Sequence, residues 1–455
     1  MSGVRTESDS FGPIDVPVDV LWGAQTARSL YFFSIGEQRM PLPLIHALAW
    51  VKWAAAIVNG ELKLLAATKS EAIANAAQRV AQGEFDAEFP LSVWQTGSGT
   101  QSNMNVNEVV AYLAGPHIHP NDDVNLGQSS NDVFPSAMHI AVALHAKSSL
   151  QPALATMRST LSDKAAAFSD ILKIGRTHLQ DATPITLGQE LGGYEAQLGA
   201  CANQIEHTLL AVHQLAIGGT AVGTGLNTHP AFGVRVAAKL AIQLDLPLTQ
   251  ADNLFAALAG HEALVAFHAS LKMLAIALTK IANDIRLMGS GPRAGLGELQ
   301  LPQNEPGSSI MPGKVNPTQI EALTMVCAQV MGHDAAIGFA ASQGHFELNV
   351  YKPLIILDTL DSLRLLTDAM HSFTRHCLLG ITPNAARMEE LLQRSLMLVT
   401  ALTPHIGYDR AARIAKHAQE QGSTLRAAAW ALESISAEQF DAWVNPSQML
   451  GPHAH

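Results

Sequence analysis

Two serines, a lysine and an asparagine lie within one short loop, residues 307–317 (GSSIMPGKVNP). Its glycines permit unusual backbone dihedral angles, and Pro317 suits the first turn of a following helix. The free N–H groups and the positive dipole at the start of that helix favour a nearby anion. A polar, flexible connector is the simpler interpretation of a Gly/Ser loop. Because four such polar side chains share a proline-braced loop, we interpret it as an anion-binding loop.

Three further loops could take part in the same chemistry. Residues 97–103 and 128–132 are dense in short hydrogen-bonding side chains beside apolar helices, and both could hold carboxylates. Taken alone, each is more often a cap or a turn. Residues 175–181 carry Thr177 and His178, which could place an acid/base group at the end of a helical bundle, although a lone histidine is usually structural. The glycine-rich residues 218–225 do not follow a predicted strand, so a dinucleotide site is weakly supported.

The elements that must position these loops are predicted to be long helices. One apolar seam alternates spacings of three and four residues, which is typical of a helical bundle. This seam consists of Leu264, Phe267, Leu271, Leu274, Leu278, Ile281 and Ile285. A helix over 252–288 would span about 55 Å. A second stripe runs from Leu150 to Leu161, with Pro152 as a kink or a helix start, and a third follows Pro317.

This pattern predicts a mainly helical, all-α chain whose bundle is completed by partner chains. Neither a run of alternating strands nor a βαβ rhythm is present in the sequence. We predict three parts: an N-terminal domain over 1–128, a central helical bundle over 129–380 and a small helical C-terminal domain over 381–455.

Composition restricts the possible partners and compartments. Of 455 residues, 48% are hydrophobic and 15% charged, and the net charge is −11. Such an acidic protein is a poor match for nucleic acid or an anionic membrane, so a pocket for an acidic substrate must be locally positive. The three cysteines are too dispersed for a metal knuckle, a disulfide framework or a clustered iron–sulfur site. Without an expected signal peptide, transit peptide or membrane span, we expect a cytoplasmic protein.

Taken together and in this order, the loops resemble those of the aspartase/fumarase superfamily. Residues 307–317 are similar to its signature loop, and the resemblance extends from residues 21–26 to residues 405–409. Residues 177–184, 225–230 and 346–353 resemble the fumarase branch. Aspartases usually carry an acidic residue in place of Lys352 and commonly a threonine in place of Ser130.

The resemblance implies a fold and an assembly. Members have a small N-terminal domain, a long central helical domain and a small C-terminal domain. Four central domains form a twenty-helix core in a homotetramer, and each active site draws loops from three subunits. It also implies a fumarate hydratase, a lyase without metal or cofactor that reversibly and stereospecifically hydrates fumarate to L-malate in the tricarboxylic acid cycle.

The resemblance further implies residue roles. Ser308 would be the base that removes the C3 proton of malate, with its alkoxide stabilised by loop N–H groups and Lys314. His178 would act on the water that becomes or leaves as the C2 hydroxyl, and Glu321 would orient this histidine. The substrate would be bound by Ser98, Gly99, Thr100, Ser129, Ser130, Asn131, Thr177, Ser309, Lys314, Val315 and Asn316.

One departure and two alternatives remain. Fumarases often have a second dicarboxylate site, which here would comprise His119, Pro120, Asn121 and Asp122. The preceding residues 113–118 contain neither Arg nor Lys, which weakens the case for anion binding there. Ammonia elimination from aspartate is the alternative activity, disfavoured by Lys352 and His229. An inactive, crystallin-like structural role is the other, disfavoured by the intact set of reactive residues.

Overall fold

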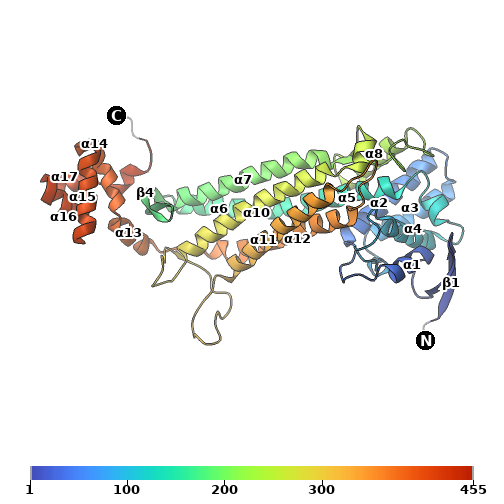
Figure 1. The fold of residues 1–455 in the computed structure, drawn as a ribbon, viewed down its shortest axis with the longest axis horizontal. Helices are drawn as coiled ribbons and strands as arrows, with labels where there is room; N and C mark the ends of the chain where they lie inside the picture. The colour runs from blue at the N-terminus through green and yellow to red at the C-terminus, as the bar shows by residue number, and fades with distance from the viewer. Residues whose placement is uncertain (1–2, 453–455) are drawn as a thin grey trace. The chain divides into compact units, whose positions relative to one another are not determined.

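The computed structural model describes residues 3–452 and is mainly helical (Figure 1), as predicted. The longer helices are α2 (Leu42–Glu61), α5 (Ser130–His145), α6 (Gln151–Ala167), α7 (Leu187–Val212), α10 (Glu262–Met288), α11 (Thr318–Ala341) and α12 (Lys352–His376). The shorter helices are α1 (Ala24–Phe32), α3 (Ala67–Ala81), α4 (Thr100–Ala114), α8 (Phe232–Leu244), α9 (Leu254–Ala259), α13 (Ala385–Arg394), α14 (Thr403–Ile406), α15 (Tyr408–Gln421), α16 (Leu425–Glu433) and α17 (Ala437–Trp443).

The strands among the described residues form four small sheets of two strands each. Two are antiparallel hairpins: β1 (Val4–Asp9) with β2 (Gly12–Pro17), and β3 (Leu172–Thr177) with β4 (Gln180–Thr186). The other two join distant residues: β5 (Gln214–Leu215) is parallel to β6 (Thr249–Gln250), and β7 (Leu299–Gln300) is antiparallel to β8 (Thr382–Pro383). These strands were not predicted from the sequence, but they leave the mainly helical class unchanged.

The chain divides into two compact units. Unit 1 comprises Met1–Ala153, Cys201–Ile276 and Met325–Asp368; unit 2 comprises Leu154–Ala200, Ala277–Thr324 and Ala369–His455. The boundaries fall inside the long helices, so a single helix such as α10 contributes its first part to unit 1 and its last part to unit 2. The division into three domains at residues 128 and 380 stays a prediction.

The predicted seam is the buried face of α10. All seven of its apolar side chains have a relative exposure of 0%. The helix predicted over 252–288 is nevertheless interrupted, because α9 ends at Ala259 and α10 begins at Glu262. Gly260 between them adopts an extended conformation (φ −113°, ψ 163°). Glycine has a low helix propensity, which makes it a natural point for such a break.

Two prolines mark helix starts. Pro152 lies in the first turn of α6, as the helix-start interpretation predicts, directly after the π-helical turn Ala146–Leu150. The kink stays a prediction. Pro317 directly precedes α11, and its carbonyl accepts a hydrogen bond from the Glu321 N–H at 3.1 Å. A proline fits there because the first N–H groups of a helix need no partner within it.

Helices α2 and α10 are long and apolar enough to cross a membrane by length and composition alone. Within the structure, 67% of the most apolar window of α2 and 50% of that of α10 are buried. Core helices of compact domains have the same length and composition, and α2 carries the fully buried Lys52. The prediction that no segment spans a membrane stays a prediction.

Candidate active site

The loop of residues 307–317 supplies backbone donors to Ser308. The Ser308 hydroxyl oxygen accepts hydrogen bonds from the N–H groups of Ile310 (3.3 Å) and Met311 (3.0 Å). Two converging N–H groups stabilise negative charge on the oxygen that accepts from them. The local fold of this loop therefore prepares Ser308 Oγ to carry an alkoxide charge.

Further bonds close the same loop on itself. The Gly307 N–H donates to the Lys314 carbonyl at 3.0 Å, and Asn316 Nδ2 donates to the Gly307 carbonyl at 2.5 Å. A Cβ on Gly307 would lie 2.5 Å from the Lys314 carbonyl oxygen, so only glycine permits this approach. The Lys314 ammonium donates to Asn316 Oδ1 at 2.7 Å, and no carboxylate among the described residues pairs with it. A cation is thus left available at the surface of the loop.

Lys314 and Asn316 line a cavity of about 600 Å³ in unit 2. Arg286, at the end of α10, is a second cation of the lining, and no acidic side chain is part of it. The pocket also lies at the N-terminus of α11, whose dipole adds positive potential. This acidic protein therefore has a locally positive pocket, which is what we expected from the sequence if the substrate is acidic. Ser308 and Ser309 are not among its lining residues.

His178 lies at the tip of the β3–β4 hairpin, where it is exposed. Thr177 pairs with Gln180, so His178 and Leu179 are the two turn residues, with φ values of 58° and 59°. A two-residue turn with positive φ at both positions matches the twist of a hairpin, but non-glycine residues rarely adopt that conformation. Since the imidazole has no hydrogen-bond partner among the described residues, it projects freely from the hairpin.

Glu321 lies on the exposed first turn of α11. Both Glu321 and His178 belong to unit 2, yet no hydrogen bond or ion pair joins them among the described residues. Their pairing stays a prediction, and a single chain does not satisfy it. Thr177, which precedes His178, is likewise exposed.

In unit 1, residues 97–103 form a tight turn into α4. Ser98 Oγ lies 2.9 Å from Thr100 Oγ1, so the two hydroxyls share a hydrogen bond. Gly99 has a φ of +78°, and a Cβ there would lie 2.2 Å from the Phe134 ring. Glycine is therefore required at this position, for its dihedral angle and for space. The turn places two adjacent hydroxyls at the start of a helix, where they could meet an anion.

The second polar loop starts α5 with a capping box. The Ser129 hydroxyl accepts from the Asn131 N–H at 3.2 Å, and the Ser129 N–H donates to Asp132 Oδ1 at 2.9 Å. Asn103 Nδ2 donates to Ser130 Oγ at 3.0 Å, which joins this loop to residues 97–103. Asn131 Nδ2 donates to the Ala221 carbonyl at 2.9 Å in the glycine-rich segment. The structure thus brings three of the loops together, and the glycine-rich one is a structural partner rather than a nucleotide site.

A pair of buried charges below these loops was missed by the sequence analysis. Asp132 Oδ2 accepts from the N–H groups of Gly218 (2.9 Å) and Thr220 (3.0 Å). Lys52 Nζ donates to Asn125 Oδ1 and Gln128 Oε1, both at 2.9 Å. Burial raises the pKa of Asp132 to about 6 and lowers the pKa of Lys52 to about 7. The available signal was Lys52, the single lysine in the middle of the mainly apolar helix α2.

The segment of the second dicarboxylate site is an acidic turn. His119 Nδ1 accepts from the Asp122 N–H at 3.1 Å and caps the turn Pro120–Val124. Lys69, from α3, is the cation that reaches this segment, and both oxygens of Asp123 bind it at 2.8 Å. A lysine neutralised in this way has little attraction left for a dicarboxylate, which supports the doubt raised by the sequence.

No group of three or more His, Cys, Asp or Glu side chains within residues 3–452 is arranged to hold a metal ion. The three cysteines are buried, and none of them is part of a disulfide. The absence of a metal or cofactor stays a prediction.

Comparisons with known proteins agree with the resemblance of the loops. Residues 12–332 match the lyase family, and residues 398–451 match the fumarase C C-terminus family. The class II fumarate hydratase of Chromobacterium violaceum is 61% identical over 98% of this chain and 99% of its own length. The chain belongs to the class II fumarase family. The predicted membership of the aspartase/fumarase superfamily is therefore confirmed.

Solved structures of this superfamily have the same fold. A class II fumarase from Schistosoma mansoni has a TM-score of 0.98 at 44% identity, over 99% of this chain and all of its own. A structure titled fumarate lyase:delta crystallin from Brucella melitensis, bound to cobalt, has a TM-score of 0.95 at 40% identity, over 99% of this chain and all of its own. The family's fold is thus shared over nearly the full length.

Proposed function

We propose that this chain is a hydro-lyase that adds water reversibly and stereospecifically to fumarate, giving L-malate in the tricarboxylic acid cycle, and that it acts in the cytoplasm without a metal or cofactor. The observation that carries the proposal is Ser308, whose oxygen accepts from two loop N–H groups in the loop that also presents Lys314. Full-length similarity to class II fumarate hydratases supports the choice of substrate.

The difficult step is removal of the malate C3 proton, because it leaves a carbanion beside a carboxylate. The resulting aci-carboxylate carries two negative charges and needs donors that are already in position. Ser308 would take the proton as an alkoxide, which the N–H groups of Ile310 and Met311 stabilise. Lys314 and Asn316, already hydrogen bonded to one another, would polarise the carboxylate oxygens.

The opposite face of the substrate would receive the water. His178 would act on this water, which becomes the C2 hydroxyl on hydration and leaves from it on elimination. Glu321 would orient the imidazole and raise its basicity. The carboxylates would be held by the hydroxyl and amide groups of Ser98, Thr100, Ser129, Ser130, Asn131 and Thr177. Because Ser308 and the water would act on opposite faces of the substrate, the addition would be anti.

The active unit is proposed to be a homotetramer in which each site takes loops from three subunits. Exposed apolar side chains on the long helices support this assembly: Ile276 on α10 is 54% exposed, and Met325 and Phe339 on α11 are 68% and 63% exposed. A chain that left such side chains in water would be prone to associate. Within the described part of one chain, neither a hydrogen bond nor an ion pair joins His178 to Glu321. This is what we expect if the two residues meet in a site shared between subunits.

Subunit mixing tests the shared site directly. His178→Ala and Ser308→Ala chains are each expected to be nearly inactive, whereas mixed tetramers should recover activity because some sites receive both intact residues. Two inactive variants that stay inactive after unfolding and refolding together would contradict a shared site. Analytical ultracentrifugation of the parent chain checks the tetramer independently.

The activity itself is tested by ultraviolet absorbance of the fumarate double bond. With L-malate we expect the absorbance to rise, unchanged after treatment with a chelator, and with L-aspartate we expect no rise. A rise with aspartate alone would reassign the chain to ammonia elimination, loss of activity on chelation would reveal a metal, and no rise with either substrate would favour a structural role.

A further inference from the structure

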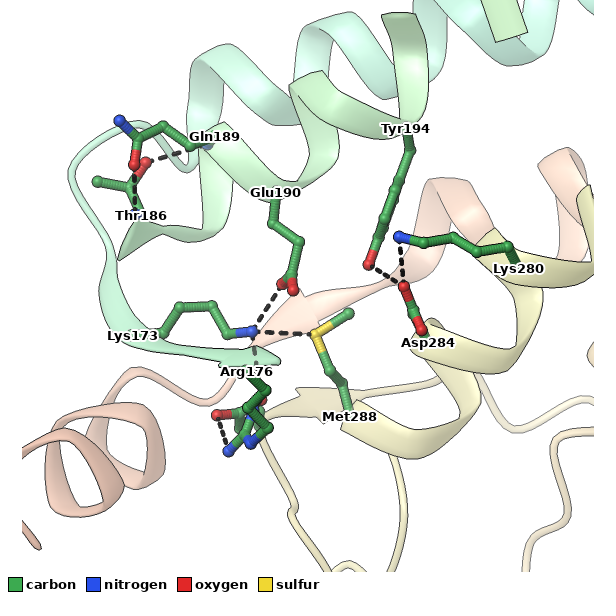
Figure 2. Close-up of polar contacts among 10 residues, drawn as sticks. Lys173, Arg176, Thr186, Gln189, Glu190, Tyr194, Lys280, Asp284 and Met288 are labelled. Carbon is green, nitrogen blue, oxygen red and sulfur yellow. Dashed lines mark hydrogen bonds and ion pairs between the residues drawn. The ribbon is translucent and has the colours of Figure 1, made fainter. Parts of the chain in front are cut away.

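Four charged side chains meet beneath the hairpin that carries His178. Lys173 and Arg176 are on β3, and Glu190 is on α7 (Figure 2). Glu298 directly precedes β7. Glu298 has a relative exposure of 0% and Lys173 of 1%. The four formal charges sum to zero, and burying such a network is tolerable only when its members are paired.

Arg176 donates two parallel hydrogen bonds to the carboxylate of Glu298. Arg176 Nη1 lies 2.9 Å from Glu298 Oε2, and Nη2 lies 2.9 Å from Oε1. Lys173 Nζ lies 3.5 Å from Glu298 Oε2 and 2.6 Å from Glu190 Oε2. A two-bond fork between guanidinium and carboxylate fixes orientation as well as distance, which a single bond does not.

The hairpin is shaped so that both cations reach Glu298. Residues three apart on a regular strand, such as Lys173 and Arg176, point to opposite faces. The pairing of β3 with β4 shifts register between Ile174 and Arg176, and this interrupts the alternation. A Cβ on Gly175 at the shift would lie 2.7 Å from the Thr183 carbonyl. The irregularity at Gly175 thus accompanies the convergence of the two cations.

Glu298 is itself anchored through its backbone to two other elements. Its N–H donates to the Met288 carbonyl at the end of α10 (2.8 Å), and its carbonyl accepts from the Asn384 N–H before α13 (2.8 Å). The chain then runs through β7 to the loop of residues 307–317. Glu298 therefore binds the hairpin through its carboxylate, and the end of α10 and the start of α13 through its backbone.

We propose that Glu298 is a positioning residue for His178: through the fork to Arg176, two residues before His178, it holds the exposed hairpin tip in place. The imidazole at the tip makes no hydrogen bond within residues 3–452, and the two turn residues adopt an uncommon backbone conformation. Without the fork, the tip would sample other orientations, and His178 would meet the reacting water less often. The inference about catalysis rests on the proposed function, but the tethering of the hairpin does not.

The test uses the variant Glu298→Gln, which keeps the shape of the side chain and removes its charge. Hydrogen–deuterium exchange of peptides covering residues 172–186 is expected to quicken at least 10-fold relative to the parent, while peptides from unit 1 stay unchanged. With malate, kcat is expected to fall about 10- to 100-fold and KM to change less than 3-fold. A loss of orientation lowers the rate of the chemical step more than the binding of substrate.

Two further variants keep the test decisive. Glu298→Asp keeps the charge but shortens the side chain, so it retains part of the fork and should fall between parent and Glu298→Gln; it serves if the amide variant fails to fold. Glu195→Gln is the matched control, because Glu195 accepts from Nε and Nη2 of Arg158 in the same unit, away from the hairpin. It should leave kcat and the exchange of residues 172–186 at parental values.

The outcomes separate the two proposals. Parental exchange in the hairpin of folded Glu298→Gln, or parental kcat, would overturn the positioning role. Faster exchange in the hairpin, in a chain whose parent form shows no activity with malate, would leave the tether standing and overturn the proposed function instead. A fall in melting temperature with kcat unchanged per folded tetramer would assign Glu298 a purely structural role and so overturn the proposal.

Discussion

The loops of unit 1 that we propose to bind substrate and the residues of unit 2 that we propose as acid and base are supported in opposite ways. Ser130 and Asn131 are held by side chain and backbone bonds above the buried charges of Lys52 and Asp132. Ser308 and His178 lie on projections, one on a loop closed on itself and one on a hairpin tip. The groups proposed to bind substrate are thus built into a compact core, while the groups proposed to move protons project from the chain. In the proposed tetramer, loops of partner chains would complete the site around them.

The largest effect is expected from Ser308→Ala. Removal of a base that acts only in the transition state should lower kcat by about 10⁴-fold with KM changed less than about threefold. Ser309→Ala is the neighbouring control and should lose about tenfold at most, since no backbone N–H bond to its hydroxyl is present among the described residues. Rates are followed by fumarate absorbance. Similar losses in both variants would show that the loop as a whole, rather than Ser308, carries the chemistry.

The second largest effect is expected on stability, when the buried Asp132 of unit 1 is replaced. In Asp132→Asn, the carboxylate that accepts from Ser129, Gly218 and Thr220 becomes an amide with one acceptor, and the buried Lys52 loses the negative charge near it. We expect a loss of about 2–4 kcal/mol of stability, measured as the shift of the urea midpoint at pH 7. Asp163→Asn, on an exposed position of α6, should stay within about 0.5 kcal/mol. A small shift in both would mean that the buried charge is dispensable.

A pH dependence follows from Lys52. Burial lowers the pKa of Lys52 from 10.5 to about 7. Its contribution to the free energy of unfolding is therefore full above pH 10.5 and is lost as the pH falls through 7. Asp132, with a pKa raised to about 6, contributes most below its unfolded pKa of 3.8 and loses its contribution by about pH 6, below this window.

Between pH 7 and 9.5 the parent chain should therefore gain about 3 kcal/mol that Lys52→Met does not gain. The measurement is the urea midpoint at the two pH values, with Lys416→Met on the exposed face of α15 as the control. A parallel rise in Lys52→Met would assign the dependence to another group.

The smallest effect is expected in the acidic turn at His119. Because Asp123 already neutralises Lys69 there, His119→Ala should change kcat/KM less than about twofold, and equilibrium dialysis with the parent should find one dicarboxylate bound per subunit. Two dicarboxylates per subunit, reduced to one in the variant, would restore the second site that the family often has.

Much of the candidate site could be predicted because its signals are local. Ser308, Lys314 and Asn316 lie within nine residues of one another, and their loop has a recognisable sequence. The seam of α10 was predictable for the same reason, since a spacing of three and four residues is a property of neighbouring positions. The break at Gly260 was missed because a single glycine within a helical pattern is often tolerated.

The sequence by itself determined the helical class, the loops and their order, and hence the family. Only the tertiary structure decided that Lys52 lies buried near Asp132, that His178 lies at a hairpin tip, and that Arg176 grips Glu298. The reason is distance along the chain: Arg176 and Glu298 are 122 residues apart. Burial and pairing of charges depend on which distant segments meet, and no local pattern records that.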